Sequence, residues 1–349
     1  MSDLSTVLIP DVHGDRDALD DALIHSGSAE QKQGRLRVHD DVAVVQTGDL
    51  LDRGKQNLLV LDRLLELREQ MGDRLTLLIG NHDGTLLQCM QHPEDVQSVE
   101  HWLCRLGGMK VLMNIAERFQ LTLAKPSLET FPVSLSSLTS LEKVLTEVTW
   151  GNTVKKYNAS STDFPRAFEK ARQLFLGRGE YASVFRAMHL ACAPRPNILA
   201  VHAGVDREHC ASSPEELTQQ YRTLYRQKSL SVFSYSDAPF GEFIWMRRGE
   251  QPRKKLLDRP TSEALLGQEK DLLIHGHDIL WGGVQEHRQC YGVRDMNGDV
   301  GMSHGYRQSP SHWGYIKIDE SNSITANNDT SGEQDFGRID DDRYVPPKR

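Results

Sequence analysis

The feature that most constrains the fold of this chain is an apolar run that stops abruptly at a group of polar residues. Residues 42–45 are Val, Ala, Val and Val, and they lead into a loop that contains Asp49, Asp52 and Arg53. Such a run predicts a buried strand whose carboxyl end opens into a polar loop. In open α/β sheets, this end of the strands is where ligands bind. The segment therefore predicts both a strand and one part of a site.

Four other apolar runs end in the same way, each followed closely by carboxylate, amide or imidazole side chains. Residues 7–9 precede Asp11 and His13, residues 75–79 precede Asn81 and His82, residues 198–201 precede His202, and residues 272–274 precede His275 and His277. Any one of these clusters, taken alone, is more often a surface turn or a satisfied buried histidine. Because all of them occur in one chain, we expect the strand ends to converge on one rim and to form a site.

The N-terminal part of the chain alternates between strand and helix patterns, which predicts parallel strands joined by crossover helices and an α/β fold. We expect strands at residues 4–9, 42–47 and 75–79, helices at 15–26 and 56–71, and a surface loop at 30–41. The helix at 56–71 is the best defined, because its leucines recur at helical spacing.

The middle of the chain has a different character. Residues 84–195 are expected to be a mainly helical insertion that covers the rim of the site. The helical patterns lie at 84–91, 95–107, 109–121, 164–176 and 181–190, with a loop at 126–140. Beyond the insertion we expect a helix at 213–227 and strands of a second sheet near 283–293, 298–302 and 312–318. The catalytic domain would then span residues 1–320, and the polar residues 321–349 would form a disordered tail.

Charge and cysteine content narrow the class of protein. The formal net charge of −8 argues against a broad nucleic-acid-binding surface, so we expect no nucleic-acid partner. The five cysteines are scattered and form no CxxC pair, which is typical of reduced thiols. The chain begins with no signal-peptide pattern and contains no run of about 18 apolar residues. We therefore expect a cytoplasmic protein without a membrane partner; no oligomeric state is predicted.

The nitrogen and oxygen ligands at the strand ends suit two divalent metal ions. Asp49 has two carboxylate oxygens, and these can bridge cations about 3.5–4 Å apart. We assign Asp11, His13, Asp49 and His277 to one ion, and Asp49, Asn81, His202 and His275 to the other. A ligand set without thiolate suits first-row ions better than calcium, with manganese as our first expectation and iron or zinc as alternatives. A hydroxide held between the two ions would be the nucleophile.

Two arginines near these clusters are expected to bind phosphate. Arg53 presents a planar guanidinium group that matches phosphate oxygens and keeps its charge. Arg247 is expected to supply a second cation, with Arg248 as the alternative. Asn81 and His202 are also expected to contact the substrate.

His82 is the candidate general acid. It follows Asn81 directly, so it should lie near the metal ions, where it can protonate a leaving alkoxide. Asp52 can hold the far ring nitrogen of His82, which fixes the tautomer and favours the protonated form.

Together these residues resemble the motifs of the calcineurin-like metallophosphoesterase superfamily. The matching motifs are Asp11-x-His13-Gly14, Gly48-Asp49-x-x-Asp52-Arg53-Gly54, Gly80-Asn81-His82-Asp83, His202-Ala203-Gly204 and His275-x-His277. The Asp52-Arg53-Gly54 ending is similar to the phosphoprotein phosphatase type, and residues 45–49 with 299–303 are most similar to its Shewanella-like bacterial branch. The resemblance implies two central β-sheets flanked by helices, a two-metal centre and hydrolysis of phosphomonoesters.

The resemblance also implies a substrate class and alternatives to it. It implies a protein phosphatase acting on phosphorylated Ser, Thr or Tyr, with Arg53 and the Arg247 region at the phosphate. Asp83 and Ala203 stand where this family usually has glutamate and glycine, and both changes are similar to diadenosine tetraphosphate hydrolases, which share the fold. A hydrolase of such dinucleotides or of another small phosphoester is therefore the alternative. An inactive phosphate-binding module is an alternative from another class.

Overall fold

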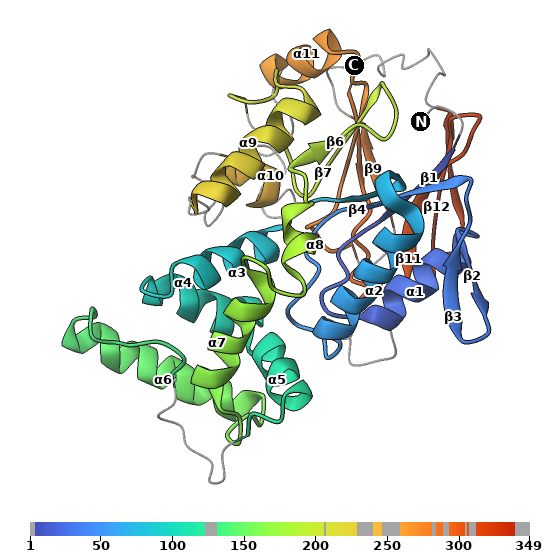
Figure 1. Ribbon diagram of the computed structural model, residues 1–349. Helices are drawn as coiled ribbons and strands as arrows, with labels where there is room; N and C mark the ends of the chain where they lie inside the picture. Colours follow the sequence, from blue (N-terminus) through green and yellow to red (C-terminus); the bar gives the residue numbers. More distant parts are fainter. Residues whose placement is uncertain are drawn as a thin grey trace.

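A computed structural model of the chain contains two mixed sheets, a separate hairpin and many helices (Figure 1). It describes residues 4–122, 131–205, 207–228, 240–245, 259–280, 284–288, 293–303, 306 and 312–338. Buried residues from both sheets and from the surrounding helices join in one hydrophobic core. The predicted α/β class is confirmed.

The first sheet has six strands in the order β13-β12-β11-β1-β4-β5. At its centre, β1 (Ser5–Ile9), β4 (Val42–Gln46) and β5 (Leu75–Leu77) are parallel. The connections between them contain α1 (Arg16–His25) and α2 (Asn57–Met71), as predicted from the alternation of patterns. Because the three strands are parallel, their carboxyl ends lie at the same edge of the sheet.

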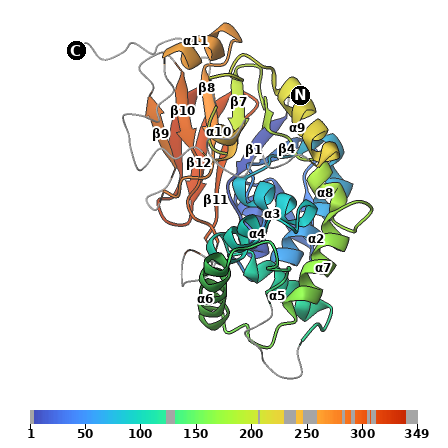
Figure 2. The same cartoon turned by 90° about the vertical axis from the view of Figure 1, so that its left-hand side faces the viewer.

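The second sheet has five strands in the order β6-β7-β8-β10-β9. These are β6 (Ala191–Cys192), β7 (Ile198–Val201), β8 (Leu272–His275), β10 (Arg294–Asn297) and β9 (Gln285–Arg288). Strands β7, β8 and β10 are parallel, so the two predicted ligand segments after β7 and β8 also share one edge. Helices α9 (Pro214–Gln227), α10 (Gly241–Trp245) and α11 (Arg259–Gly267) lie beside this sheet (Figure 2).

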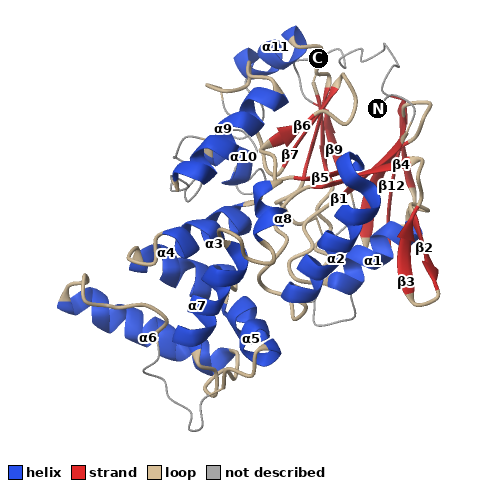
Figure 3. Cartoon of the chain, in the orientation of Figure 1, coloured by secondary structure: helices blue, strands red, loops and turns tan. Residues whose placement is uncertain are grey.

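The region from residue 81 to 186 is mainly helical, as expected. Its helices are α3 (Asn81–Gln91), α4 (Val96–Glu100), the π-helix η2 (His101–Leu106), α5 (Met109–Arg118), α6 (Ser140–Lys156), α7 (Phe164–Phe175) and α8 (Ala182–Arg186). Figure 3 shows that α4, α5, α6 and α7 gather on one side of the molecule, away from the strands. Helix α6 was not predicted, because its buried side is partly formed by Thr146 and Thr153 and the apolar periodicity is weak.

One segment that was expected to be a loop contains strands. The predicted loop at 30–41 holds a hairpin, β2 (Ala29–Lys32) and β3 (Arg35–Val38), joined through Gln33 and Gly34. Both turn residues have positive φ angles, 52° and 77°, as hairpin turns of the primed types require. Conversely, the strand expected at 298–302 is a loop, and the strand lies earlier, at β10.

The expectation of a disordered tail after residue 320 is wrong for much of that segment. Strands β12 (Ser323–Asn328) and β13 (Gln334–Arg338) extend the first sheet antiparallel from β11 (Gly314–Ile318). In β12 only alternate residues are buried, so the sequence looks polar although one face packs on the core. A domain boundary at residue 320 therefore cuts through the first sheet. The division of the chain into a catalytic domain and an 84–195 insertion stays a proposal.

Some predictions concern residues that the structure does not describe. Arg247, Arg248, part of the loop at 126–140 and the end of the expected tail lie outside the described residues. Within the described part of the chain, none of the helices is long and apolar enough to cross a membrane.

The packing of β12 gives a first prediction. Ile324 is fully buried, so Ile324→Ala should lower the free energy of unfolding by about 2–5 kcal/mol. Thr325→Ala on the half-exposed face of the same strand is the matched control and should cost about 0.5 kcal/mol. Urea denaturation measures both values. Equal unfolding curves for the two variants would show that this strand is not part of the folded core.

Candidate metal centre

The ligand residues predicted at the strand ends meet in one buried site. Asp11 and His13 follow β1, Asp49 follows β4, and His202 follows β7. Each of these side chains is at most 1% exposed. The backbone N–H of His277, after β8, donates to Asp11 Oδ2 at 3.1 Å, so the first and last segments of the site are in direct contact.

One group of ligand atoms surrounds Asp49 Oδ2. His13 Nε2 lies 3.5 Å and His82 Nε2 lies 3.8 Å from this oxygen. His13 Nδ1 lies 3.2 Å from the carbonyl oxygen of Leu51, so with its proton on Nδ1 the ring keeps Nε2 as an acceptor. His13, Asp49 and His82 can together offer ligand atoms to one ion.

A second group lies at the other oxygen of the same carboxylate. His202 Nε2 is 3.6 Å from Asp49 Oδ1, and it is 3.2 Å from both Asn81 Oδ1 and His277 Nδ1. His202 Nδ1 donates to the carbonyl oxygen of Thr47 at 2.8 Å, which leaves Nε2 available for an ion. Asp49 is thus shared by two groups of ligands, the arrangement that a bridging carboxylate requires.

His275 at the end of β8 and His277 just after it are arranged differently from the predicted assignment. His277, which we had assigned with His13, lies beside His202. His275, which we had assigned with His202, has Nδ1 2.8 Å from the Gly276 carbonyl oxygen and Nε2 3.5 Å from Asp295 Oδ1. It belongs to neither ligand group among the described residues. The local reason is the chain reversal after β8, where His277 has a left-handed φ of 69°.

The electrostatics of the site favour a bound cation. Burial and the neighbouring carboxylates raise the pKa of Asp11, and they raise the pKa of Asp83 to about 8. Burial, Arg53 and His202 lower the pKa of His13. Asp11 Oδ1 is buried and accepts no hydrogen bond from any described residue. Packed carboxylates and neutral imidazoles with an unsatisfied oxygen are the donor set that divalent ions neutralise, so the residues fit the predicted metals.

Asp83 positions the loop that carries Asp49. Its two carboxylate oxygens accept from the backbone N–H groups of Asp49 at 2.8 Å, Gly80 at 3.0 Å and Leu50 at 3.1 Å. These bonds tie the loop after β4 to the start of α3. The residue that departs from the usual family pattern therefore has a structural role here.

The predicted pair of Asp52 and His82 is present. His82 Nδ1 lies 2.7 Å from Asp52 Oδ2, and both side chains are buried. The other oxygen of Asp52 accepts from the indole N–H of Trp102 at 3.0 Å. Sequence analysis missed Trp102, which comes from the helical region 50 positions downstream. The aspartate thus links the histidine of the site to the helices beside it.

Arg53 lies next to this pair with a guanidinium group that is partly unsatisfied. Its Nε atom is buried and makes no hydrogen bond to any described residue. The guanidinium carbon lies 4.9 Å from the centre of the Tyr306 ring, and the Tyr306 hydroxyl donates to His13 Nε2 at 2.8 Å. Sequence analysis missed Tyr306, and its single aromatic side chain in a polar loop gave no signal.

Comparison with known proteins agrees with this geometry. The model of the calcineurin-like phosphoesterase family matches residues 4–295. A structure described as a cold-active protein tyrosine phosphatase is similar with 13% identity and a TM-score of 0.56, over 96% of this chain and 79% of that chain. A cold-active protein-tyrosine phosphatase of a psychrophilic Shewanella species is similar with 14% identity and a TM-score of 0.53, over 95% and 80%. Among curated proteins, none matches the sequence.

The chain belongs to the calcineurin-like phosphoesterase family, as the resemblance of its motifs implied. It is a metal-dependent phosphoesterase, and the site around Asp49 offers the buried His and Asp groups that such an enzyme needs for divalent ions. The similarity to the tyrosine phosphatase structures shows a shared fold.

The shared position of Asp49 predicts the effect of neutralising it. Asp49→Asn should weaken metal binding by at least about 100-fold, because both ligand groups lose the same charge. Elemental analysis after dialysis against dilute metal measures the bound ions. Asp73→Asn, at an exposed aspartate, is the control and should keep full metal content. Normal metal content in Asp49→Asn would contradict the bridging role.

The Trp102 contact predicts a separate effect on turnover. Trp102→Phe removes a hydrogen bond to a buried carboxylate and should lower kcat for phenyl phosphate about tenfold or more while metal content stays normal. Trp150→Phe is the matched control, because the Trp150 indole N–H is buried without a hydrogen-bond partner among the described residues. If both variants lose kcat equally, Trp102 acts only through packing.

Proposed function

We propose that this protein is a phosphoprotein phosphatase that hydrolyses phosphomonoesters of Ser, Thr or Tyr residues. The observation that carries the proposal is the buried Asp52–His82 pair, with Nδ1 and Oδ2 2.7 Å apart, beside the ligand groups of Asp49. A proton donor at this place is needed when the leaving group is a poor one, such as a serine or threonine alkoxide. Two divalent ions, when bound, would supply the activated water that attacks phosphorus.

Other residues of the chain would bind the phosphate and transfer the proton. Arg53 binds the phosphate oxygens, because its guanidinium lies beside the ligand groups and keeps an unsatisfied buried N–H. His82 holds one proton on Nδ1 toward Asp52 and donates a second one from Nε2 to the leaving oxygen. Burial lowers the pKa of His82 and raises the pKa of Asp52, and the 2.7 Å contact between Nδ1 and Oδ2 is what would hold a proton on the histidine ring. Arg247 or Arg248 remains our proposal for the second phosphate contact.

The metal and cellular setting are part of the same proposal. The nitrogen and oxygen ligands without thiolate support a binuclear centre with manganese, or with iron or zinc. We assign Asp11, His13, Asp49, Asn81, His202 and His277 as its ligands, with His82 at its edge. The described cysteines are all free, which supports a cytoplasmic location.

A direct comparison of substrates tests the proposed function. We expect kcat/KM for a panel of Ser, Thr and Tyr phosphopeptides to exceed that for diadenosine tetraphosphate at equal manganese concentration. Faster turnover of the dinucleotide would make the small-phosphoester hydrolase the better assignment. Failure to hydrolyse even p-nitrophenyl phosphate, with no metal bound, would leave only the phosphate-binding module.

The general-acid role predicts a dependence on the leaving group. His82→Asn should lower kcat by at least about 100-fold for phenyl phosphate, and much less for p-nitrophenyl phosphate, whose phenolate leaves without a proton. Metal content, measured in parallel, should stay near that of the wild type. Equal losses on the two esters would mean that His82 acts on the metals or on binding and does not protonate the leaving group.

A further inference from the structure

A group of arginines lines two adjoining pockets at the junction of α8, α9 and the end of α3. The first pocket has a volume of about 350 Å³ and is lined by Arg186, Gln219, Arg222, Tyr225 and Arg226. The second has a volume of about 420 Å³ and shares Tyr225 and Arg226 with the first. It adds Gln91, Lys228 and the α7 residues Glu169 and Arg172 among others. We call the two pockets together the basic groove.

Four of the five cations that line the basic groove lack acidic partners among the described residues, and Arg172 is the exception. Arg186, Arg222 and Arg226 make no ion pair with a carboxylate in the described part of the chain, and neither does Lys228. Their polar contacts are to backbone carbonyls, such as Arg226 Nε to the Arg222 oxygen at 3.1 Å. The chain carries more acidic than basic residues, with a net charge of −8, so unpaired arginines in one pocket are not a consequence of composition. Their mutual repulsion would be relieved by a bound anion.

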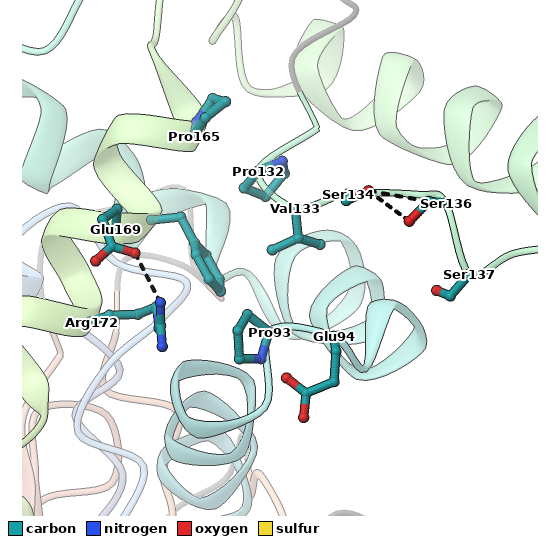
Figure 4. Close-up of a pocket in the computed structure, with 11 residues that line it drawn as sticks. Pro93, Glu94, Pro132, Val133, Ser134, Ser136, Ser137, Pro165, Glu169 and Arg172 are labelled. Atoms are coloured by element: carbon teal, nitrogen blue, oxygen red, sulfur yellow. Dashed lines mark hydrogen bonds and ion pairs between the residues drawn. The ribbon is translucent and has the colours of Figure 1, made fainter.

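Other arginines of the same protein show the contrast. Arg63 pairs with Asp20 at 2.7 Å, and Arg118 pairs with Asp62. Arg172, which also borders the second pocket, pairs with Glu169 at 2.9 Å on the same helix, as Figure 4 shows. Four cations of the groove, all exposed, thus lie together in two adjoining pockets without a paired carboxylate from the described residues.

The pocket in Figure 4 does not share this property. It has a volume of about 410 Å³ and is lined by Pro93, Pro132, Pro165 and Phe168 together with serines. Its one arginine is already paired, since Arg172 lies 2.9 Å from Glu169, and Glu94 contacts His92 Nδ1 at 3.1 Å. No unpaired charge there indicates a ligand class.

Tyr225 forms the floor between the two pockets of the basic groove. Its side chain is only 9% exposed, and its hydroxyl makes no hydrogen bond to any described residue. A phenol and several guanidinium groups around one cavity can donate to carboxylate oxygens, which guanidinium groups bind with two parallel hydrogen bonds. The chemistry of the groove thus matches an anion with planar, bidentate oxygen pairs.

The groove is separate from the metal centre. Asn81 begins α3 inside the metal centre, and Gln91 ends the same helix at the second pocket. At 1.5 Å per residue, the two ends lie on the order of 15 Å apart. An extended peptide covers about 3.3 Å per residue, so roughly five residues are the shortest link between the two sites.

From these observations we propose that the basic groove binds an acidic segment, rich in Asp and Glu, of the protein substrate. The acidic segment would lie at least about five residues from the phosphorylated residue. A polynucleotide fits less well, because the rest of the protein is acidic and Tyr225, the one aromatic ring among the described residues of the groove, is buried and poorly placed to stack on bases. Only one part of this inference rests on the proposed function, namely that the bound peptide belongs to a protein substrate. The anion site itself is inferred from the arginines that have no carboxylate partner in the described part of the chain.

Direct binding tests the groove independently of catalysis. The probe is a fluorescent, unphosphorylated peptide of alternating Glu and Gly, compared with a Gln and Gly peptide of the same length. We expect the metal-loaded wild-type protein to bind the acidic peptide and not to bind the neutral one. The affinity for the acidic peptide should fall as salt is added. Arg222→Glu combined with Arg226→Glu should weaken binding at least about tenfold.

A matched variant controls for net charge. Arg35→Glu combined with Arg37→Glu introduces the same charge change on the exposed hairpin strand β3 and should leave binding within about twofold of the wild type. If the groove double variant unfolds, Arg222→Gln with Arg226→Gln replaces it. Unchanged binding in a folded groove variant, or equal loss in the hairpin variant, overturns the proposal. Tighter binding of a single-stranded oligonucleotide of equal charge would assign the groove to nucleic acid instead.

A kinetic arm separates this inference from the proposed function. Two phosphopeptides carry the same phosphorylated residue and a spacer of about ten residues, and end in either an acidic or a neutral segment. The acidic segment should lower KM several-fold in the wild type and in the hairpin variant, but not in the groove variant, while p-nitrophenyl phosphate turnover stays constant in all three. Binding of the acidic peptide without hydrolysis of either phosphopeptide would uphold the groove and refute the phosphatase assignment.

Discussion

The site depends on one carboxylate that faces two groups of ligands. Asp49 presents Oδ2 to His13 at 3.5 Å and Oδ1 to His202 at 3.6 Å. Its loop is held by Asp83, which binds three backbone N–H groups at once. Several carboxylates packed together without water are costly unless cations or hydrogen bonds offset their charge. The same buried carboxylates therefore give the site affinity for divalent ions.

Much of this arrangement follows from local sequence patterns. Apolar runs that end in ligand residues predicted β1, β4, β7 and β8, and parallel pairing of these strands brings their carboxyl ends to shared edges. Strand and helix periodicity is a local property, so it could be recognised without knowledge of the fold. The polar strands β2, β3, β12 and β13 were missed because only one of their faces is buried or because they lie at sheet edges.

The remaining parts of the site depend on contacts that local patterns do not encode. Trp102 reaches Asp52 across 50 positions of sequence, and Tyr306 reaches His13 across 293. Either aromatic residue alone predicts only burial. The assignment of His275 and His277 differed for a related reason: two histidines in one short motif have equal chemistry, and local sequence does not show that it is the ring of His277 that lies beside His202.

The indole N–H of Trp102 belongs to a π-helix, and the adjoining Gly108 lies so close to its ring that an added Cβ would meet the indole at 2.1 Å. The hydrogen bond from Trp102 to Asp52 thus links the π-helix to the carboxylate that contacts His82 at the start of α3. Because Asp52 contacts both side chains, the position of His82 depends on how the π-helix packs against the loop after β4.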